Sequence, residues 1–413
     1  MDAIQLLRGL TRLKNRRLHL GVAGSVACYR SAELLRHLLA CGIHVSATLT
    51  PGAKNFVTPL LFSSLGAVPV YPEMFSGEEP FAHLEPGQTC QALLVCPASA
   101  GLLARMAHGL AQDMLAAQIL AFDGPVAAAP AMNTRMWNNA ATRDNVALLK
   151  SRGVTIVEPD SGLMACGTSG EGRLADMPQL LAHALRLLCE QDMAGQTVLV
   201  TLGPTREPWD GVRFWSNPST GTMGAALALC AWLRGATVHA VAGPGIGSAL
   251  VPALPGLTLH QVTTARQMFA RASELWDTAS MGMFSAAVAD FSPRPYGAEK
   301  FKKEGTDTFR VDFEANPDIL RTLSEKKRPG QRLLGFAAET APDMESLMAL
   351  ARKKLRRKDV HVLAANRVNA AGSGFGSATN AMAVAGRDGR EEFWPEMGKA
   401  DVAWDLCSWL LHS

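Results

Sequence analysis

Short apolar runs alternate with longer stretches of helical periodicity through the first half of the chain. The runs have the length of buried strands and lie at 18–22, 45–49, 92–96, 126–129 and 155–157. A helical pattern at 26–40 follows the first of them. This alternation is typical of a parallel, doubly wound sheet. Ligands bind beyond the carboxyl ends of the strands in such a fold, so we expect chemistry in the loops at 23–25, 50–54, 97–101 and 130–133.

The same pattern restarts after a short polar break at 191–195. Further buried strands are predicted at 197–201, 237–241, 281–287, 333–337 and 361–365, with a helix at 221–234. These elements predict a second, independent α/β layer structure. The predicted organisation is a basic N-terminal extension at 1–15, a first domain at 16–190, a linker at 191–195 and a second domain at 196–413.

Composition narrows the class of protein. The 413 residues suffice for two or three domains, and 48% hydrophobic and 19% charged residues are typical of a soluble globular chain. A net charge of +3 is too small to indicate nucleic-acid or membrane binding. The eight cysteines form no C-x-x-C pair, so neither a disulfide framework nor a zinc site is expected. We therefore expect a cytoplasmic protein with reduced thiols, whose basic N-terminus forms a short amphipathic helix or frays.

Cys166 lies in a glycine-rich stretch at 161–173, where four glycines occur within eleven residues. Such a backbone is costly to order and usually serves close approach to a ligand. A thiol in its middle could act as a nucleophile or as a proton donor. The alternative is a small buried cysteine in an ordinary connection between a helix and a strand.

Other candidate residues follow the predicted strands of the first half. Gly24 and Ser25 open a helix, where amide donors and the helix dipole accept a phosphate, and Ser99 lies at a second such turn. Because the three-glycine fingerprint of dinucleotide folds is missing, a mononucleotide such as FMN is favoured. Asn133 could hold a carboxylate, or it could cap the following helix. His83, taken alone, is typical of a surface histidine.

Together these motifs resemble the flavin-dependent cysteine decarboxylases, and residues 16–190 resemble phosphopantothenoylcysteine decarboxylase. The resemblance rests on Ala23–Arg30, Thr50–Phe56, Ala82–Glu85, Pro97–Gly101, Pro130–Trp137 and Ser161–Arg173, in that order. It implies a flavodoxin-like domain that binds FMN through Gly24, Ser25, Thr50 and Ser99. It also implies that His83 is the active-site histidine, that Asn133 binds the substrate carboxylate, and that Cys166 is the acid of the reductive half-reaction.

The second half carries polar motifs around its first strand-to-helix junction, at 205–207, 210–213 and 216–221. Arginines and hydroxyls there could bind an anion, or they could tie down a surface loop. Asp290 ends a strand, and Lys300 follows on a loop with hinge-like prolines. Residues 196–390 resemble phosphopantothenate–cysteine ligase, a Rossmann-like domain. The resemblance implies that Asn217 contacts the acyl-nucleotide, Asp290 the nucleoside and Lys300 the activated phosphates, with Phe336, Lys354 and Lys358 at further nucleotide-binding positions.

The resulting hypothesis is a bifunctional enzyme of coenzyme A biosynthesis. It would join cysteine to 4′-phosphopantothenate with CTP and Mg²⁺, then decarboxylate the product with FMN. The sequence does not identify the residues that bind Mg²⁺. A homo-oligomer is expected, with trimer contacts through the first half and dimer contacts through the second. Thr222, His361 and Arg367 stand where the ligases usually have a lysine and two aspartates. These departures leave open a decarboxylase whose second half serves only binding or oligomerisation; a peptide cysteine decarboxylase and a non-enzymatic flavin-binding regulator are less favoured.

Overall fold

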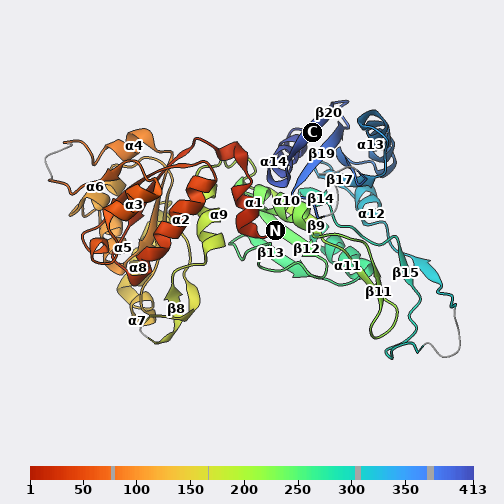
Figure 1. Cartoon of the computed structure of the whole chain (residues 1–413), viewed down its shortest axis with the longest axis horizontal. Coiled ribbons are helices and arrows are strands. Elements are labelled where there is room, and N and C mark those ends of the chain that lie inside the picture. Colours follow the sequence, from red (N-terminus) through yellow and green to blue (C-terminus); the bar gives the residue numbers. More distant parts are fainter. Residues whose placement is uncertain (76–79, 166, 303–307, 370–375) are drawn as a thin grey trace. The chain divides into compact units, whose positions relative to one another are not determined.

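The computed structural model describes residues 1–75, 80–165, 167–302, 308–369 and 376–413, so Cys166 lies outside the described residues. The chain forms two compact units (Figure 1). Leu10–Cys189 make the N-terminal unit, whereas Met1–Gly9 and Glu190–Ser413 make the C-terminal unit. The expected pair of doubly wound α/β domains is confirmed, and each unit is described by itself below. No helix in the described part of the chain has the length and apolar character needed to cross a membrane.

The N-terminal unit is built on a six-stranded parallel sheet of order β3-β2-β1-β4-β5-β6. Its strands are β1 (Arg17–Val22), β2 (His44–Leu49), β3 (Val70–Tyr71), β4 (Ala92–Ala98), β5 (Val126–Pro130) and β6 (Thr155–Ile156). β4 is buried along its whole length, as its continuous apolar run predicts. The order reverses between β1 and β4, so a crevice opens at the carboxyl ends of these two strands.

Helices flank this sheet (Figure 1). They are η1 (Thr11–Leu13), η2 (Val26–Cys28), α2 (Tyr29–Ala40), η3 (Ala53–Asn55), α3 (Pro59–Leu65), α4 (Glu85–Thr89), α5 (Ala100–His108), α6 (Met114–Leu120), α7 (Thr134–Trp137), α8 (Ala140–Ser151) and α9 (Met177–Leu187). Local sequence explains several starts: Thr58 and Asp113 accept backbone N–H bonds at the first turns of α3 and α6. A short antiparallel pair, β7 (Asp160–Leu163) and β8 (Ser169–Arg173), projects from the sheet's carboxyl side and was not predicted.

The C-terminal unit has an eight-stranded sheet of order β13-β12-β9-β14-β17-β18-β19-β20. Its strands are β9 (Thr197–Leu202), β12 (Thr237–Ala242), β13 (Leu257–Gln261), β14 (Met281–Phe284), β17 (Arg332–Glu339), β18 (Val362–Arg367), β19 (Thr379–Gly386) and β20 (Glu391–Gly398). The first six are parallel, with the reversal between β9 and β14, and the last two add antiparallel pairs. Two further antiparallel pairs lie outside the sheet: β10 (Arg206–Pro208) with β11 (Phe214–Ser216), and β15 (Phe291–Pro293) with β16 (Phe313–Ala315).

The helices of this unit are α10 (Thr222–Leu233), α11 (Ala265–Trp276), α12 (Ile319–Glu325), α13 (Met344–Lys358) and α14 (Lys399–Leu411). Every residue of α10 except Met223 is buried. A helix that is apolar on all sides belongs in a core, and α10 contacts β9 and β12 as well as α14. Its first residues therefore have a fixed position at the carboxyl end of β9.

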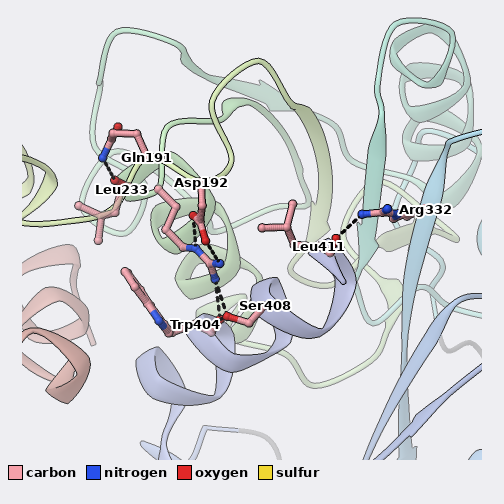
Figure 2. Close-up of polar contacts among 8 residues, drawn as sticks. Gln191, Asp192, Leu233, Arg332, Trp404, Ser408 and Leu411 are labelled. Carbon is pink, nitrogen blue, oxygen red and sulfur yellow. Dashed lines mark hydrogen bonds and ion pairs between the residues drawn. The ribbon is translucent and has the colours of Figure 1, made fainter. Parts of the chain in front are cut away.

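Residues predicted as a linker are tied into the C-terminal unit (Figure 2). Asp192 accepts hydrogen bonds from Nε and Nη2 of Arg234 at 2.9 and 2.5 Å. Arg234 is 3% exposed and also donates to the Trp404 carbonyl and to the Ser408 hydroxyl, both on α14. Gln191 donates to the Leu233 carbonyl at 3.0 Å. This network holds the start of the unit against the end of α10 and against α14.

The first nine residues also belong to the C-terminal unit. They form α1 (Ala3–Arg8), whose N-terminus is capped by a reciprocal capping box between Asp2 and Gln5. Leu6 and Leu7 are almost fully buried, α1 contacts α14, and the Ala3 amide donates to the Ala249 carbonyl at 2.8 Å. The basic N-terminal segment thus contains an ordered amphipathic helix that completes the core of the unit encoded by the second half.

We expect Leu7→Ala to destabilise the C-terminal unit by roughly 2–5 kcal/mol, because it leaves a cavity beside a buried helix. Arg8→Ala, at an exposed position of the same helix, is the control. Urea unfolding followed by pulsed hydrogen exchange would assign each transition to a unit. An equal shift in both units, or no shift with Leu7→Ala, would contradict the assignment of α1.

Candidate active sites

In the N-terminal unit, two backbones approach closely at the sheet's carboxyl edge. Gly24 follows β1 and Gly52 follows β2, and a Cβ on Gly24 would lie 2.7 Å from the carbonyl carbon of Gly52. No side chain fits at that distance. The contact keeps the β1 loop flat beside the crevice, so its backbone N–H groups can come close to a bound group.

Three hydroxyls line the same edge as caps of helical turns. Ser25 Oγ accepts from the Ala27 amide, Thr50 Oγ1 from the Ala53 amide and Ser99 Oγ from the Leu102 amide. These distances are 3.4, 3.3 and 3.4 Å, long for hydrogen bonds. Ser25 and Ser99 are the N-caps of η2 and α5, after β1 and β4, whereas Thr50 directly follows β2 and lies two residues before Gly52, the N-cap of η3. Hydroxyls and amide donors gathered at helix N-termini around a crevice fit a phosphate-bearing group.

Asn133 caps α7, which is one of the two roles that the sequence suggested for it. Its Oδ1 accepts from the Arg135 amide at 2.9 Å, while its Nδ2 donates to Thr168 Oγ1 at 3.3 Å. Thr168 precedes β8, and Met132 donates to the Gly172 carbonyl at 2.9 Å. Gly172 has φ +126°, and a Cβ there would lie 2.4 Å from the Met132 carbonyl oxygen. The segment that follows Cys166 is thus anchored against the Asn133 loop.

His83 is half-buried in the turn that precedes α4. The structure brings Gly24, Ser25, Thr50 and Ser99 to one edge of the sheet, whereas His83 lies on the separate segment before α4.

The C-terminal unit contains a cavity of about 610 Å³ at the carboxyl ends of its central strands. That volume is within the range of small-molecule sites. Five residues predicted from the sequence line it, namely Asn217, Asp290, Phe336, Lys354 and Lys358. They come from four separate segments, because Lys354 and Lys358 share α13. Lys300 is exposed and is not among the lining residues.

Amide side chains fix the walls of this cavity. Asn217 donates from Nδ2 to the Val288 carbonyl at 3.0 Å, and Asn316 donates to the Ala289 carbonyl at 2.8 Å. The Asn316 backbone amide in turn donates to the Asp290 carbonyl. The loop after β14, which carries the exposed carboxylate of Asp290, is thereby held from both sides.

The two cavity lysines on α13 have carboxylate partners. Lys354 lies 2.5 Å from Glu339, and Lys358 pairs with Asp318. Burial alone would raise the pKa of Asp318, but the Lys358 ammonium and the Arg321 backbone amide outweigh it, and the pKa falls below its ordinary value. Because these lysines are partly exposed to the cavity, an incoming phosphate could compete for them.

Asp210 anchors the segment that carries Lys300. Its Oδ2 accepts from the Phe301 amide at 3.0 Å, and its Oδ1 accepts from the Val212 and Arg213 amides. Burial would raise the pKa of Asp210, but these three backbone donors and the Arg213 charge hold it below its ordinary value. The carboxylate therefore stays ionised at neutral pH, and the anchor weakens only as the pH falls through that lowered pKa.

Comparisons with known proteins agree with this two-site architecture. Residues 7–188 match the family model "Flavoprotein", and residues 193–412 match the "DNA/pantothenate metabolism flavoprotein C-terminal domain". The coenzyme A biosynthesis bifunctional protein CoaBC of Bacillus subtilis is 36% identical over 402 residues, which cover 95% of this chain and 96% of that protein. The chain belongs to the CoaBC family. CoaBC of Escherichia coli K12 is also 36% identical, over 91% of this chain and 92% of its own. A crystal structure of a CoaBC C-terminal domain is 31% identical, with TM-score 0.44, and covers 54% of this chain and 97% of that domain.

Three residues depart from the pattern expected of a CoaBC ligase half, and the structure places them differently. Thr222 lines the cavity, where its hydroxyl lies 2.8 Å from that of Thr220. His361 directly precedes β18 and is not among the lining residues, and its Nδ1 accepts from the Leu333 amide. Arg367 ends β18 between two lining residues but does not itself line the cavity. Only the change at Thr222 therefore alters the chemistry of the wall.

Sequence reasoning missed two buried lining residues, Asn380 and Lys399. Asn380 lies on β19 and Lys399 begins α14, neither of which was predicted. Burial lowers the pKa of Lys399. Lys399 opens an apolar helix near the C-terminus. Its place in the cavity can be recognised only when the two antiparallel strands that precede this helix are known.

We expect Gly24→Ala to destabilise the N-terminal unit by about 1–3 kcal/mol, because the added methyl meets backbone that cannot move aside. Gly52→Ala is the matched control, since its Cβ would have its nearest neighbour at 3.6 Å, an ordinary contact. Denaturant unfolding of both variants checks this. Equal stability of the two would show that the backbone contact is not close.

Asp210→Asn should speed tryptic cleavage after Lys300 and Lys302, because an amide nitrogen cannot accept the Phe301 hydrogen bond and the segment loosens. Glu299→Gln removes an exposed neighbouring carboxylate and serves as the control. Cleavage kinetics by mass spectrometry would decide: unchanged rates at both lysines in Asp210→Asn would refute the anchor.

Proposed function

We propose that the protein converts 4′-phosphopantothenate into 4′-phosphopantetheine in two steps, each in its own unit. The observation that supports the proposal most is that the chain matches coenzyme A biosynthesis bifunctional proteins along almost its whole length. The second unit would join cysteine to 4′-phosphopantothenate with CTP. The first would then remove carbon dioxide from the cysteine moiety.

The ligation step begins in the cavity of the C-terminal unit. A carboxylate oxygen of 4′-phosphopantothenate attacks the α-phosphorus of CTP, a new O–P bond forms, and pyrophosphate leaves. The cysteine amine then attacks the acyl carbon, the C–O bond to the nucleotide breaks, and CMP leaves. Lys354 and Lys358 would hold the phosphates, Asn217 the acyl-nucleotide, and Asp290 the ribose or base, with Phe336 against the nucleoside. Such fixed charges and dipoles stabilise developing negative charge without reorganising.

Lys300 and Mg²⁺ belong to the same proposal. Lys300 would reach the phosphates by movement of the segment that Asp210 anchors. The described residues contain no group of three or more metal-ligating side chains. This fits Mg²⁺ that is bound mainly through nucleotide phosphates with one or two carboxylates, for which Asp290 is suitably placed.

The decarboxylation step uses the N-terminal unit. Gly24, Ser25, Thr50 and Ser99 would hold FMN, and their narrow, hydroxyl-lined edge fits its phosphate. Bound FMN supplies reversible oxidation of the substrate thiol, which makes loss of carbon dioxide possible. Asn133 would orient the substrate carboxylate through its amide group, and His83 would move a proton at the substrate. Cys166, outside the described residues, would return a proton in the final reduction.

Assembly and location complete the proposal. Exposed aromatic side chains on the two short strand pairs of the C-terminal unit, Phe214, Trp215, Phe291 and Phe313, support dimer contacts there. Exposed apolar residues such as Tyr29, Phe56 and Leu60 support contacts between copies of the N-terminal unit, as in a trimer. We infer that the assembly works in the cytoplasm, which agrees with the free cysteines among the described residues.

Two single variants should separate the half-reactions. Asn217→Ala should slow CTP-dependent pyrophosphate release by roughly 100-fold through loss of one oriented donor, and leave decarboxylation of supplied phosphopantothenoylcysteine unchanged. Asn133→Ala should do the reverse and accumulate phosphopantothenoylcysteine. Pyrophosphate release and mass spectrometry of both variants, with CTP and with ATP, provide the test. If no nucleotide supports ligation by the wild-type protein, the second unit is a binding or oligomerisation domain.

A further inference from the structure

A chain of buried polar groups crosses the N-terminal unit behind the proposed decarboxylase site. His19 on β1 and Gln118 on α6 are both 0% exposed. His19 Nε2 lies 3.2 Å from Gln118 Oε1, and His19 Nδ1 lies 2.8 Å from Ser46 Oγ. At one end Cys90 Sγ lies 3.5 Å from Ser46 Oγ. At the other, Gln118 Nε2 donates to the carbonyl of Ala82 at 3.1 Å.

The last contact determines the direction of every hydrogen bond in the chain. A carbonyl can only accept, so the amide nitrogen of Gln118 must face Ala82, and its oxygen must face His19. His19 therefore carries its proton on Nε2. Its Nδ1 accepts from the Ser46 hydroxyl, whose lone pairs remain for the Cys90 thiol.

The imidazole of His19 stays uncharged over the working range of pH. Burial lowers the pKa of His19 to about 3, although the Gln118 bond acts in the opposite direction. The ring of Tyr71 meets the imidazole edge-on, with 5.6 Å between the ring centroids. A chain of hydrogen bonds whose directions are all set has one arrangement, which favours a fixed end point.

That end point is the peptide directly before His83. Ala82 is 2% exposed and packs with Tyr71 and Met114, and the turn closes with a bond from the Leu84 amide to the Phe81 carbonyl at 2.9 Å. Among the described residues, the Ala82 carbonyl is a polar group through which α6 holds this turn. Its contact with Gln118 therefore helps to set the position of the neighbouring His83.

We propose that Gln118 is a positioning residue for His83, held in place by His19. The proposal rests on the proposed function, because it takes His83 to act in decarboxylation. Gln118 itself is buried behind the turn and acts only through Ala82. Loss of its bond should move His83 away from its working position without removing groups that bind substrate, so kcat should fall while KM changes little.

Two substitutions of Gln118 test the hydrogen-bond pattern itself. Gln118→Met keeps the length of the side chain and removes both donor and acceptor. Gln118→Glu keeps the length and restores both when its carboxyl is protonated: the O–H donates to Ala82 and the carbonyl oxygen accepts from His19. Once ionised, it has no donor for Ala82. Val146→Ala, a buried change on α8, is the control for lost stability alone.

The experiment measures hydrogen exchange of the peptide at 80–89 and the kinetics of phosphopantothenoylcysteine decarboxylation between pH 5 and 8. We expect Gln118→Met to exchange faster there and to lose roughly 10- to 100-fold in kcat. Gln118→Glu should approach the wild-type kcat at pH 5 and fall toward Gln118→Met as the pH rises. Val146→Ala should show neither effect.

The outcomes separate the two proposals. Wild-type exchange and kcat in Gln118→Met would overturn the positioning role, as would a Gln118→Glu profile that parallels Gln118→Met at every pH. If the wild-type protein does not decarboxylate phosphopantothenoylcysteine, the proposed function fails. The exchange data, which need no substrate, still decide whether Gln118 anchors the turn.

Discussion

The reversal of strand order beside the first strand of each sheet determines where chemistry can occur in this protein. Right-handed crossovers send the chain one way for three strands and the other way for the next three. The connections diverge at β1 and β4 in one unit and at β9 and β14 in the other, and they leave a crevice at the carboxyl ends. Both candidate sites lie at these crevices.

The two units hold their functional segments by different physical means. The N-terminal unit relies on close backbone contact at Gly24 and on a neutral hydrogen-bond chain through His19 and Gln118. The C-terminal unit relies on ionised groups, with Asp210 anchoring the Lys300 segment and Asp318 pairing with Lys358. Uncharged hydrogen bonds can hold a turn in place where water is excluded. Lysines that are paired with carboxylates beside a cavity can instead exchange these partners for phosphates.

The central parallel strands were predictable because burial on both faces gives continuous apolar runs. The parallel edge strands β3 and β13, one very short and the other half exposed, were not predicted. The predicted runs at 18–22 and 197–201 agree with β1 and β9 to within one residue. The antiparallel strands β19 and β20 were missed, since β20 is mostly exposed and polar and β19 has few branched residues. Their absence hid Asn380 and Lys399. The sequence could not predict that α1 packs against the C-terminal unit. That contact depends on the burial of Leu6 and Leu7 in the tertiary structure, which no local sequence pattern reveals.

Sequence motifs identified which residues lie at the candidate sites better than they identified the contacts that hold those residues in place. Asn217, Asp290 and Lys358 all line one cavity. Asp290 lies on the loop after the parallel strand β14, whereas Lys358 ends α13. The helix caps formed by Ser25, Ser99 and Asn133 show why such residues occur there structurally, and their roles in catalysis remain a proposal. Gln118 carried no signal, because a lone glutamine in an apolar helix reveals its importance only through its partners.

The most direct test of the account is to give the purified protein 4′-phosphopantothenate, cysteine, CTP and Mg²⁺ and to follow the products by mass spectrometry. Two working units predict steady formation of 4′-phosphopantetheine, with carbon dioxide lost from the cysteine carboxyl. Accumulation of phosphopantothenoylcysteine alone, or turnover only when that compound is supplied, would contradict the claim that one chain performs both steps.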